Sequence, residues 1–218
     1  MFKHQHPYAP YIPKTATKLI VGTLPPPRFC NKEFKEGDVD FCYGSRDGYL
    51  WIILNRIFKL NLLFEPTPEA IAQRKQFLND YGIGICDIVA SAEREKVDAS
   101  DLGMKNVQTR NILWYLKEFP FIDTLLFMGG NSKNGPEYLF RKQLKEHQIK
   151  LEAISLNIPR IYQFYIANRM VKAVSLTSPS GAANRAVGAI PAYKALKKKH
   201  PNFNTIDFRV LQYVKHFK

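Results

Sequence analysis

The sequence has few cysteines, no long apolar run and no leader-like N-terminus, and each shortage excludes a class of protein. Cys30, Cys42 and Cys86 are the cysteines among 218 residues, which is typical of a reducing compartment and not of a disulfide-rich secreted domain. No apolar run approaches the roughly 18 residues needed to span a bilayer. The first residues, MFKHQHPYAPYIPK, lack the apolar region of a secretory signal. We therefore expect a soluble, intracellular protein without a membrane partner.

Motifs for metals and nucleotides are missing as well. Cys30 and Cys42 are too far apart for a CxxC site, and no histidine is placed to complete a zinc cluster. His4 and His6 are expected to be an exposed, incidental pair. Neither GxxxxGK[ST] nor GxGxxG occurs, which argues against nucleoside triphosphates and dinucleotides as ligands. We expect no metal and no cofactor.

Acidic residues are scarce relative to basic ones. The chain has 32 lysines and arginines against 19 aspartates and glutamates, which gives a formal net charge of +13. A basic surface releases counterions when it meets a phosphate backbone, so this charge favours nucleic acid as a partner. From the charge alone, a basic surface that serves only solubility is an equally good interpretation.

Four short apolar runs alternate with helical patterns along nearly the whole chain. The runs are residues 18–23, 82–90, 123–130 and 171–177, and the helical patterns are residues 49–60, 67–82, 106–120, 135–148 and 182–201. This alternation predicts a single domain over residues 1–218, a three-layer α/β/α sandwich with a central, mainly parallel four-stranded sheet. Residues 152–169 fit either a further strand or an irregular helix, and residues 204–218 either a helix or an edge strand.

The loops that follow the four apolar runs are unusually rich in glycine, proline and small polar residues. They read GTLPPPRF, CDIVASAERE, FMGGNSKNG and TSPSGAANR. Ligands of open α/β sheets bind at the carboxyl ends of the strands, so these loops are the candidate site. The glycine of the first loop, Gly22, permits close backbone approach.

Asp87 lies inside an apolar run, where a carboxylate is costly without partners. Either it accepts backbone N–H bonds, or it faces a pocket and accepts hydrogen bonds from a ligand. Asp47, in FCYGSRDGYLW, either caps the helix that follows or is a functional carboxylate beside an aromatic shelf of Phe41 or Tyr43. Asn131 either caps the next helix or contacts a ligand.

The last loop combines hydroxyls with a helix start. Ser178, Ser180 and the neighbouring amides either grip a phosphate or form an ordinary turn. Arg185 on the first turn of the next helix opposes the helix dipole, which makes more sense near a bound anion. The run KALKKKH at residues 194–200 either extends this basic track or is a solvated helix end.

Taken in order, these segments resemble the uracil-DNA glycosylase superfamily, and most closely its hypoxanthine-DNA glycosylase branch. LIVGTLPPP resembles the G-x-x-P-G motif, YGSRDGYLW resembles Y-G-H-P-R-N-x-F-W, and GIGICDIVASAERE resembles G-I-G-L-W-D-V-V-A-S-C-x-R-E. TSPSGAAN shares features of the family's final Pro/Ser loop. The resemblance covers residues 18–199.

The resemblance implies a uracil-DNA glycosylase-like fold and a monofunctional DNA N-glycosylase of base excision repair. Such a hydrolase flips a deaminated base, uracil or hypoxanthine, out of the duplex and cleaves its N-glycosidic bond without metal or cofactor. The implied partner is DNA, double-stranded and carrying a damaged or mismatched base. The implied state is a monomer, located in the cytoplasm at the nucleoid.

The resemblance also assigns residues. Alignment on SRD places Asp47 at the catalytic position, whereas alignment on Trp51 places Gly48 there. Asp87 would accept a hydrogen bond from the imino N–H of the flipped base. The other implied base contacts are Gly22, Thr23 and a stacked Phe41 or Tyr43, and the implied DNA contacts are Ser178, Pro179, Ser180, Gly181, Arg185 and Asn131.

Three positions differ from the family pattern. Leu24 or Pro25 stands where the uracil-excising branches carry Asp or Asn, Ser178 stands where His or Asn is common, and the wedge position holds the small Ala182. These differences leave room for an unusual base specificity, or for a nucleic-acid-binding protein on the same fold that has lost hydrolysis. A small-molecule enzyme whose charge is incidental is a third interpretation.

Overall fold

The computed structural model of the chain describes residues 1–98 and 100–218. Its strands are β1 (Phe2–Gln5), β2 (Lys18–Val21), β3 (Ile83–Ile85), β4 (Val89–Arg94), β5 (Lys105–Thr109), β6 (Thr124–Phe127), β7 (Glu152–Ser155), β8 (Arg160–Ile166) and β9 (Arg169–Ser175). Its α-helices are α1 (Leu50–Phe58), α2 (Pro68–Asp80), α3 (Ile112–Glu118), α4 (Pro136–Glu146), α5 (Asn184–Ala189), α6 (Pro191–Lys199) and α7 (Thr205–Phe217). Short 3-10 helices are η1 (Pro27–Phe29), η2 (Asp101–Gly103) and η3 (Gly181–Ala183).

The main sheet has the strand order β3-β2-β6-β9-β8-β7. The four strands predicted from the apolar runs are neighbours in it and are parallel to one another. β8 and β7 extend the sheet antiparallel to β9, so the sheet is larger than predicted. Because the carboxyl ends of parallel strands meet at one edge, the four glycine- and proline-rich loops lie at the same edge.

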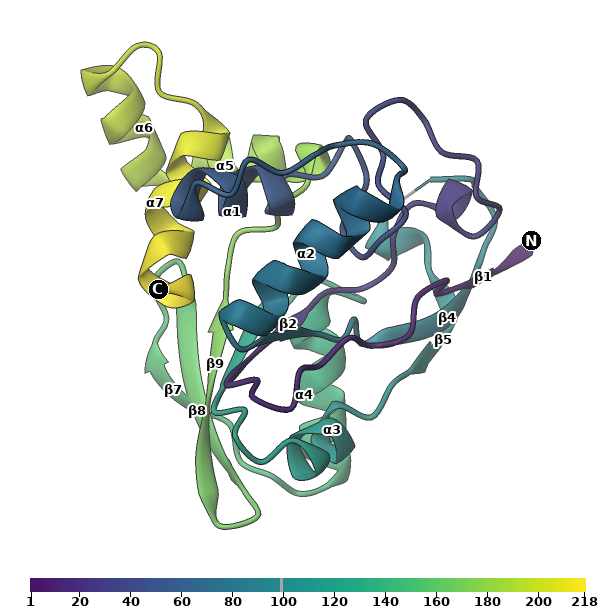
Figure 1. Ribbon diagram of the computed structural model, residues 1–218. Coiled ribbons are helices and arrows are strands. Elements are labelled where there is room, and N and C mark those ends of the chain that lie inside the picture. Colours follow the sequence, from purple (N-terminus) through teal and green to yellow (C-terminus); the bar gives the residue numbers. More distant parts are fainter. Residues whose placement is uncertain (99) are drawn as a thin grey trace.

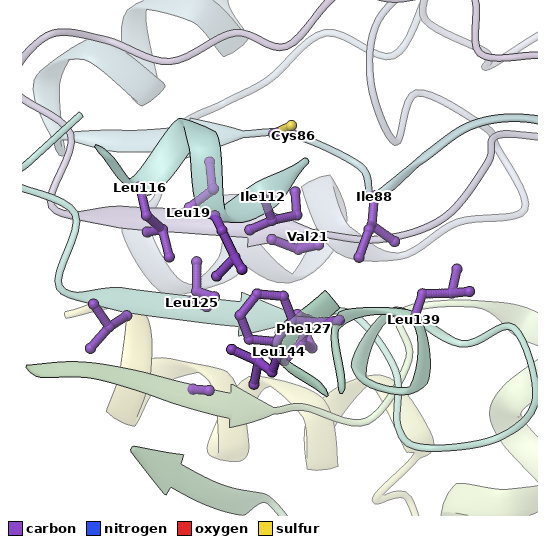
Figure 2. Packing of buried hydrophobic residues seen from close by; sticks show 14 of the residues in the cluster. Leu19, Val21, Cys86, Ile88, Ile112, Leu116, Leu125, Phe127, Leu139 and Leu144 are labelled. Carbon is purple, nitrogen blue, oxygen red and sulfur yellow. The ribbon is translucent and has the colours of Figure 1, made fainter. Parts of the chain in front are cut away.

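Helices cover both faces of this sheet, and the alternation of side chains along each strand decides which face each residue joins. Leu19, Val21, Leu125 and Phe127 point toward α3 and α4, as Figure 2 shows. The intervening strand residues Ile20, Leu126 and Val174 pack against α1, α2 and α7 on the other face. The three-layer α/β/α prediction is therefore confirmed.

The structure decides the secondary structure of the two ranges that the sequence left undecided. Residues 152–169 contain the hairpin of β7 and β8, and residues 205–217 form α7. Asn204 caps α7 with a capping box, in which its side chain accepts from the N–H of Asp207 and Asp207 accepts from the N–H of Asn204. α5, α6 and α7 gather at one corner of the molecule, with α6 on the outside (Figure 1).

Three predicted elements were wrong in extent. The run at residues 82–90 is two strands, β3 and β4, with Asp87 in the break, and β4 joins a second, antiparallel sheet of order β1-β4-β5. The helix predicted over residues 106–120 begins only at Ile112, because residues 105–109 pair with β4 as β5. The last pattern is two helices, since Pro191 lacks an N–H and begins α6 as a new helix.

The helix predicted over residues 67–82 is confirmed as α2, with the Thr67 hydroxyl capping the N–H of Ala70 at 3.3 Å. In the part of the chain that the structure describes, no helix has the length and apolar character needed to cross a bilayer.

Candidate functional site

Asp87 lies at the carboxyl end of β3, and its side chain is buried against three protein donors. Its residue is 5% exposed. Oδ1 accepts hydrogen bonds from the N–H of Gly22 (2.8 Å) and the hydroxyl of Tyr43 (2.7 Å). Oδ2 accepts from Nε2 of His6 (2.9 Å). Of the two possibilities raised by the sequence, the backbone N–H bond is present, and the hydroxyl of Tyr43 and the ring of His6 complete the hydrogen bonding of the buried carboxylate.

His6 and His4 are both buried, His4 as part of β1 in the second sheet, so the expectation of an exposed pair was wrong. Nδ1 of His6 accepts from the N–H of Tyr8 at 3.1 Å, so the neutral ring carries its proton on Nε2 and donates it to Asp87. Arg110 fastens this arrangement, because it donates to the carbonyls of Asp87 and Tyr8. The N-terminal segment is therefore part of the site.

Gly22 is required by the close approach of Tyr43. A Cβ at Gly22 would lie 2.0 Å from the Tyr43 hydroxyl and 2.8 Å from Asp87 Oδ1. Tyr43 itself has a φ of 58°, a left-handed conformation that is unfavourable for a residue with a large side chain. Burial and the neighbouring Asp87 raise the pKa of the Tyr43 phenol well above its ordinary value, so the phenol stays protonated and donates. The Tyr43 hydroxyl thus covers Oδ1 of the central carboxylate.

A second carboxylate, Asp101, links the loops after β2 and β6. The Thr23 hydroxyl donates to Asp101 Oδ1 at 2.7 Å, and the side chain of Asn134 donates to the Asp101 carbonyl at 3.1 Å. Burial raises the pKa of the Asp101 carboxyl to about 6. The sequence analysis did not single out Asp101, because nothing in SDLG distinguishes it from a surface turn.

Asp47 is held by a network of charges and does not cap a helix. Its side chain is 67% exposed and forms a salt bridge with Arg28 at 3.2 Å. Arg28 also binds Asp38 through Nε and Nη2, at 2.8 and 2.9 Å. Burial acts to raise the pKa of Asp38, but hydrogen bonds from Arg28 and from two backbone N–H groups hold it below its usual range. The N-cap of α1 is Tyr49, without a side-chain cap.

The loop that carries Asp47 is hydrogen-bonded to the Pro/Ser loop. The N–H of Tyr49 donates to the carbonyl of Pro179 at 2.7 Å, and the N–H of Gly181 donates to the carbonyl of Asp47 at 3.3 Å. Gly48 and Ser180 form the β-bridge between these two bonds. The structure therefore brings residues 47–49 and residues 179–181, far apart in the sequence, into direct contact.

The remaining predicted site residues lie in different surroundings. Phe41 is 6% exposed and packs between Tyr11 and Trp51 in the core. Asn131 is exposed in the loop before α4, whose N-cap is Gly135. Arg185 is exposed on the first turn of α5. Ser178 is half-buried, and in the described part of the chain its hydroxyl forms no hydrogen bond with Asp87 or Asp47. The Ser180 hydroxyl accepts a hydrogen bond from the N–H of Ala182.

α7 supports the Pro/Ser loop from beneath, which the sequence analysis missed. The side-chain oxygen of Gln212 accepts from the N–H and hydroxyl of Thr177, and the Tyr213 hydroxyl donates to the Thr177 carbonyl at 2.6 Å. Arg209 reaches the next residues of the loop. Once residues 205–217 are recognised as a helix, Arg209, Gln212 and Tyr213 are polar side chains on its buried face, and that pattern could have indicated the contact with the loop.

Two surface hollows lie at the opposite edge of the sheet. One, of about 320 Å³, is lined by the last turns of α4 and residues 148–151, and the other, of about 370 Å³, lies between α3 and the end of β8. Neither is lined by a residue of the strand-end loops. Neither hollow therefore coincides with the site that the sequence predicts.

The comparisons with known proteins bear on this geometry. No protein-family model matches the chain, and no curated protein matches it. Among solved structures, the chain is similar to the solution NMR structure of a "putative Uracil DNA glycosylase" from Methanosarcina acetivorans, with a TM-score of 0.57 and 13% sequence identity over 99% of this chain and 97% of that one. The two chains share a fold. At this identity the likeness concerns the fold alone, which agrees with the uracil-DNA glycosylase-like architecture expected from the motifs.

Proposed function

We propose that this protein is a monofunctional DNA glycosylase that excises a deaminated base, uracil or hypoxanthine, from DNA. The observation that carries the proposal is the hydrogen-bonded contact between residues 47–49 and 179–181 at the strand-end edge. It joins an exposed carboxylate, Asp47, to a small and rigid loop suited to enter a groove of the duplex. The fold shared with the archaeal protein supports the same class of function.

In this proposal the chemistry is hydrolysis of the bond between C1′ and the base nitrogen. The C1′–N bond breaks through an oxocarbenium-like sugar, water adds its oxygen to C1′, and the base leaves with a proton. The role proposed for Asp47 is to stabilise the cationic sugar and to orient the water, and its exposed carboxylate, bound by Arg28, supports this role. The products are a free base and an abasic site, and no cofactor is required.

Base recognition is assigned to Asp87. Uracil and hypoxanthine both present an imino N–H that a carboxylate can accept. Because the Tyr43 hydroxyl covers Oδ1, a base that reaches this oxygen must displace that hydroxyl. Gly22 and Thr23 flank the same position on the first loop. The proposal therefore requires Tyr43 to move when a base enters, while its ring remains available for stacking.

The occupied carboxylate favours a second candidate, a nucleic-acid-binding protein without hydrolysis. If the three donors on Asp87 are permanent, Asp87 is a structural clamp between β2, β3 and the N-terminal segment. In that case the Pro/Ser loop, Arg185, Asn131 and the lysines of α6 are still available to bind DNA. The two candidates differ in whether free base is released.

A strand-cleavage assay with matched variants tests the proposal. Labelled duplexes with a single uracil, hypoxanthine, xanthine or thymine mismatch are incubated with protein and then treated with alkali, which cuts at abasic sites. We expect cleavage of at least one of the four, and a loss of roughly 100-fold or more in Asp47→Ala. Asp80→Ala, which removes an exposed carboxylate at the far end of α2, is the control and should keep the wild-type rate.

Asp87→Ala should also lose excision, and Asp87→Asn separates recognition from folding because it keeps the volume of the side chain. Thermal unfolding of each variant shows whether it is folded under the assay conditions. Wild-type cleavage in both Asp47→Ala and Asp87→Ala would contradict the assigned site. Binding of the duplexes without cleavage of any would favour the second candidate.

A further inference from the structure

Arg209 on α7 is a fully buried arginine whose guanidinium is directed at the Pro/Ser loop. Its residue is 0% exposed. Nε donates to the carbonyl of Ser178 at 2.8 Å, and Nη2 donates to the carbonyl of Ser180 at 3.1 Å. Nη1 donates to Oδ1 of Asn184 at 2.8 Å, one turn beyond the loop, and to the Thr205 carbonyl at 3.3 Å. Every nitrogen of the guanidinium thus has an acceptor, and three of the four acceptors belong to residues 178–184.

The same guanidinium also contacts the other loop of the site. Its central carbon lies 5.5 Å from the centre of the Tyr49 ring, a cation–π distance. The backbone N–H of Tyr49 donates to Pro179, the residue between the two carbonyls that Arg209 binds. The side-chain nitrogen of Asn184 is 3.5 Å from the Tyr49 hydroxyl. Arg209 therefore touches both partners of the contact that joins residues 47–49 to residues 179–181.

We propose that Arg209 is the positioning residue that locks these two loops together, so that Asp47 and the Pro/Ser loop present one rigid surface to the substrate. The physical basis of the lock is independent of function, and its role in catalysis rests on the proposed function. A side chain that orders both loops in advance removes the conformational entropy that binding would otherwise have to remove.

The chemistry requires an arginine at this position. A planar guanidinium presents its donors in a fixed fork, which suits two carbonyls separated by one residue, whereas a lysine ammonium is a single point with three donors. Burial lowers the pKa of Arg209, but an arginine remains charged at neutral pH. Removal of the side chain takes the Nε donor from the part-buried carbonyl of Ser178, while the carbonyl of Ser180 keeps the N–H of Ala183 as its donor.

Arg74 provides a matched control. It is also 0% exposed and also stacks on aromatic rings, those of Trp51 and Phe64. Its hydrogen bonds go to the carbonyl of Leu63, in the connection from α1 to α2, and to the carbonyl of Ala70, in α2. Arg74→Ala should therefore destabilise the fold as the loss of any buried arginine does, without direct effect on either loop.

The experiment combines amide hydrogen exchange with excision in Arg209→Ala, Arg209→Lys and Arg74→Ala. In Arg209→Ala we expect the amides of Tyr49 and Gly181 to exchange roughly tenfold faster or more, while the strands of the main sheet keep wild-type protection. Excision should fall, and millimolar guanidinium ion should restore part of both protection and rate by entering the vacated space. Arg74→Ala should show a lowered melting temperature, wild-type loop protection and no rescue.

Equal effects of Arg209→Ala and Arg74→Ala on the two amides, or unchanged exchange in Arg209→Ala, would overturn the proposal. If Arg209→Ala does not fold, Arg209→Lys carries the test, with the same amides and the same predicted direction. Exchange is measured on the free protein, so it tests the lock even if the wild type excises no base. Absence of excision with an intact Arg209 effect would contradict the proposed function and leave the lock standing.

Discussion

The lysines of α6 give the most quantitative prediction for DNA binding. Lys194, Lys197, Lys198 and Lys199 are all exposed on a helix at the outer corner of the molecule (Figure 1). The helix is anchored by Tyr193, whose ring packs on Phe203 and Phe208. It follows α5, which begins directly after the Pro/Ser loop, so under the proposed function we expect its lysines to contact the duplex beyond that loop.

The expected magnitude follows from counterion release. Each phosphate neutralised on duplex DNA contributes about −0.9 to the slope of log K against log salt. Lys194→Gln with Lys198→Gln removes two charges one helical turn apart, so the slope should become shallower by about 1.8 if both bind phosphate. Between 50 and 200 mM salt, a fourfold change, the wild-type affinity should therefore fall about 12-fold more than that of the variant.

Fluorescence anisotropy with an undamaged labelled duplex measures both slopes. The control is Lys142→Gln with Lys145→Gln, two exposed lysines of α4, which starts at the strand ends and runs away from them. That pair carries the same change in net charge and should alter the slope by much less. If the two pairs reduce the slope equally, the charge acts through the whole protein and the assignment to α6 is refuted.

Three further predictions concern the buried groups of the site. Gly22→Ala should lower the free energy of unfolding by about 1–3 kcal/mol in chemical denaturation, because its methyl group would lie 2.0 Å from the Tyr43 hydroxyl. The loss should be smaller in a Tyr43→Phe background, and additive effects of the two substitutions would contradict the contact. Because the pKa of Asp101 is raised to about 6, the folded state binds the Asp101 proton more tightly than the unfolded state, and the free energy of unfolding should fall as pH rises from about 4 through 6. Asp101→Asn should abolish this fall, measured as the urea midpoint at each pH, and an unchanged pH profile in the variant would contradict the assignment. His4 acts in the opposite direction, because burial lowers its pKa to about 4 and the free energy of unfolding is therefore lost as pH falls from about 6.5 through 4. His4→Gln should reduce this loss in the same series of urea midpoints.

Much of the fold follows from local patterns in the sequence. The apolar runs and the Thr67 cap depend on a few neighbouring residues, and the structure has a parallel strand in each of the four runs and the cap where it was predicted. The helix start at Pro191 is also local but was missed, whereas the start of α3 depends on a distant partner. Residues 105–109 have no strong preference of their own and become a strand because β4 lies alongside them.

The site could be predicted as a set of loops but not as a set of contacts. The order of the parallel strands brings the loops to one edge, and that was foreseeable from the strand-end composition. The bond from His6 to Asp87 spans 81 positions, and the bond from Arg209 to Ser178 joins the last helix to the loop it supports. Such pairs leave no periodic trace in a single sequence, because only the folded chain brings them together.

Asp47 illustrates the same limit. The sequence offered a helix cap or a functional carboxylate, and the structure gives a salt bridge with Arg28, whose own position depends on the fully buried Asp38. The link between the two carboxylates passes through a residue of the proline-rich first loop. The motif that resembles G-x-x-P-G therefore contributes a charge partner that the motif itself does not specify.

The central claim is that this fold releases a base from DNA, and direct measurement of that product is its most decisive test. Chromatography and mass spectrometry of a single-turnover reaction with excess protein can quantify free uracil and hypoxanthine from singly substituted duplexes. The account predicts free base from at least one duplex in an amount equal to the abasic sites formed, with far less from Asp47→Ala. Intact duplexes and no free base, while DNA binding persists, would contradict it.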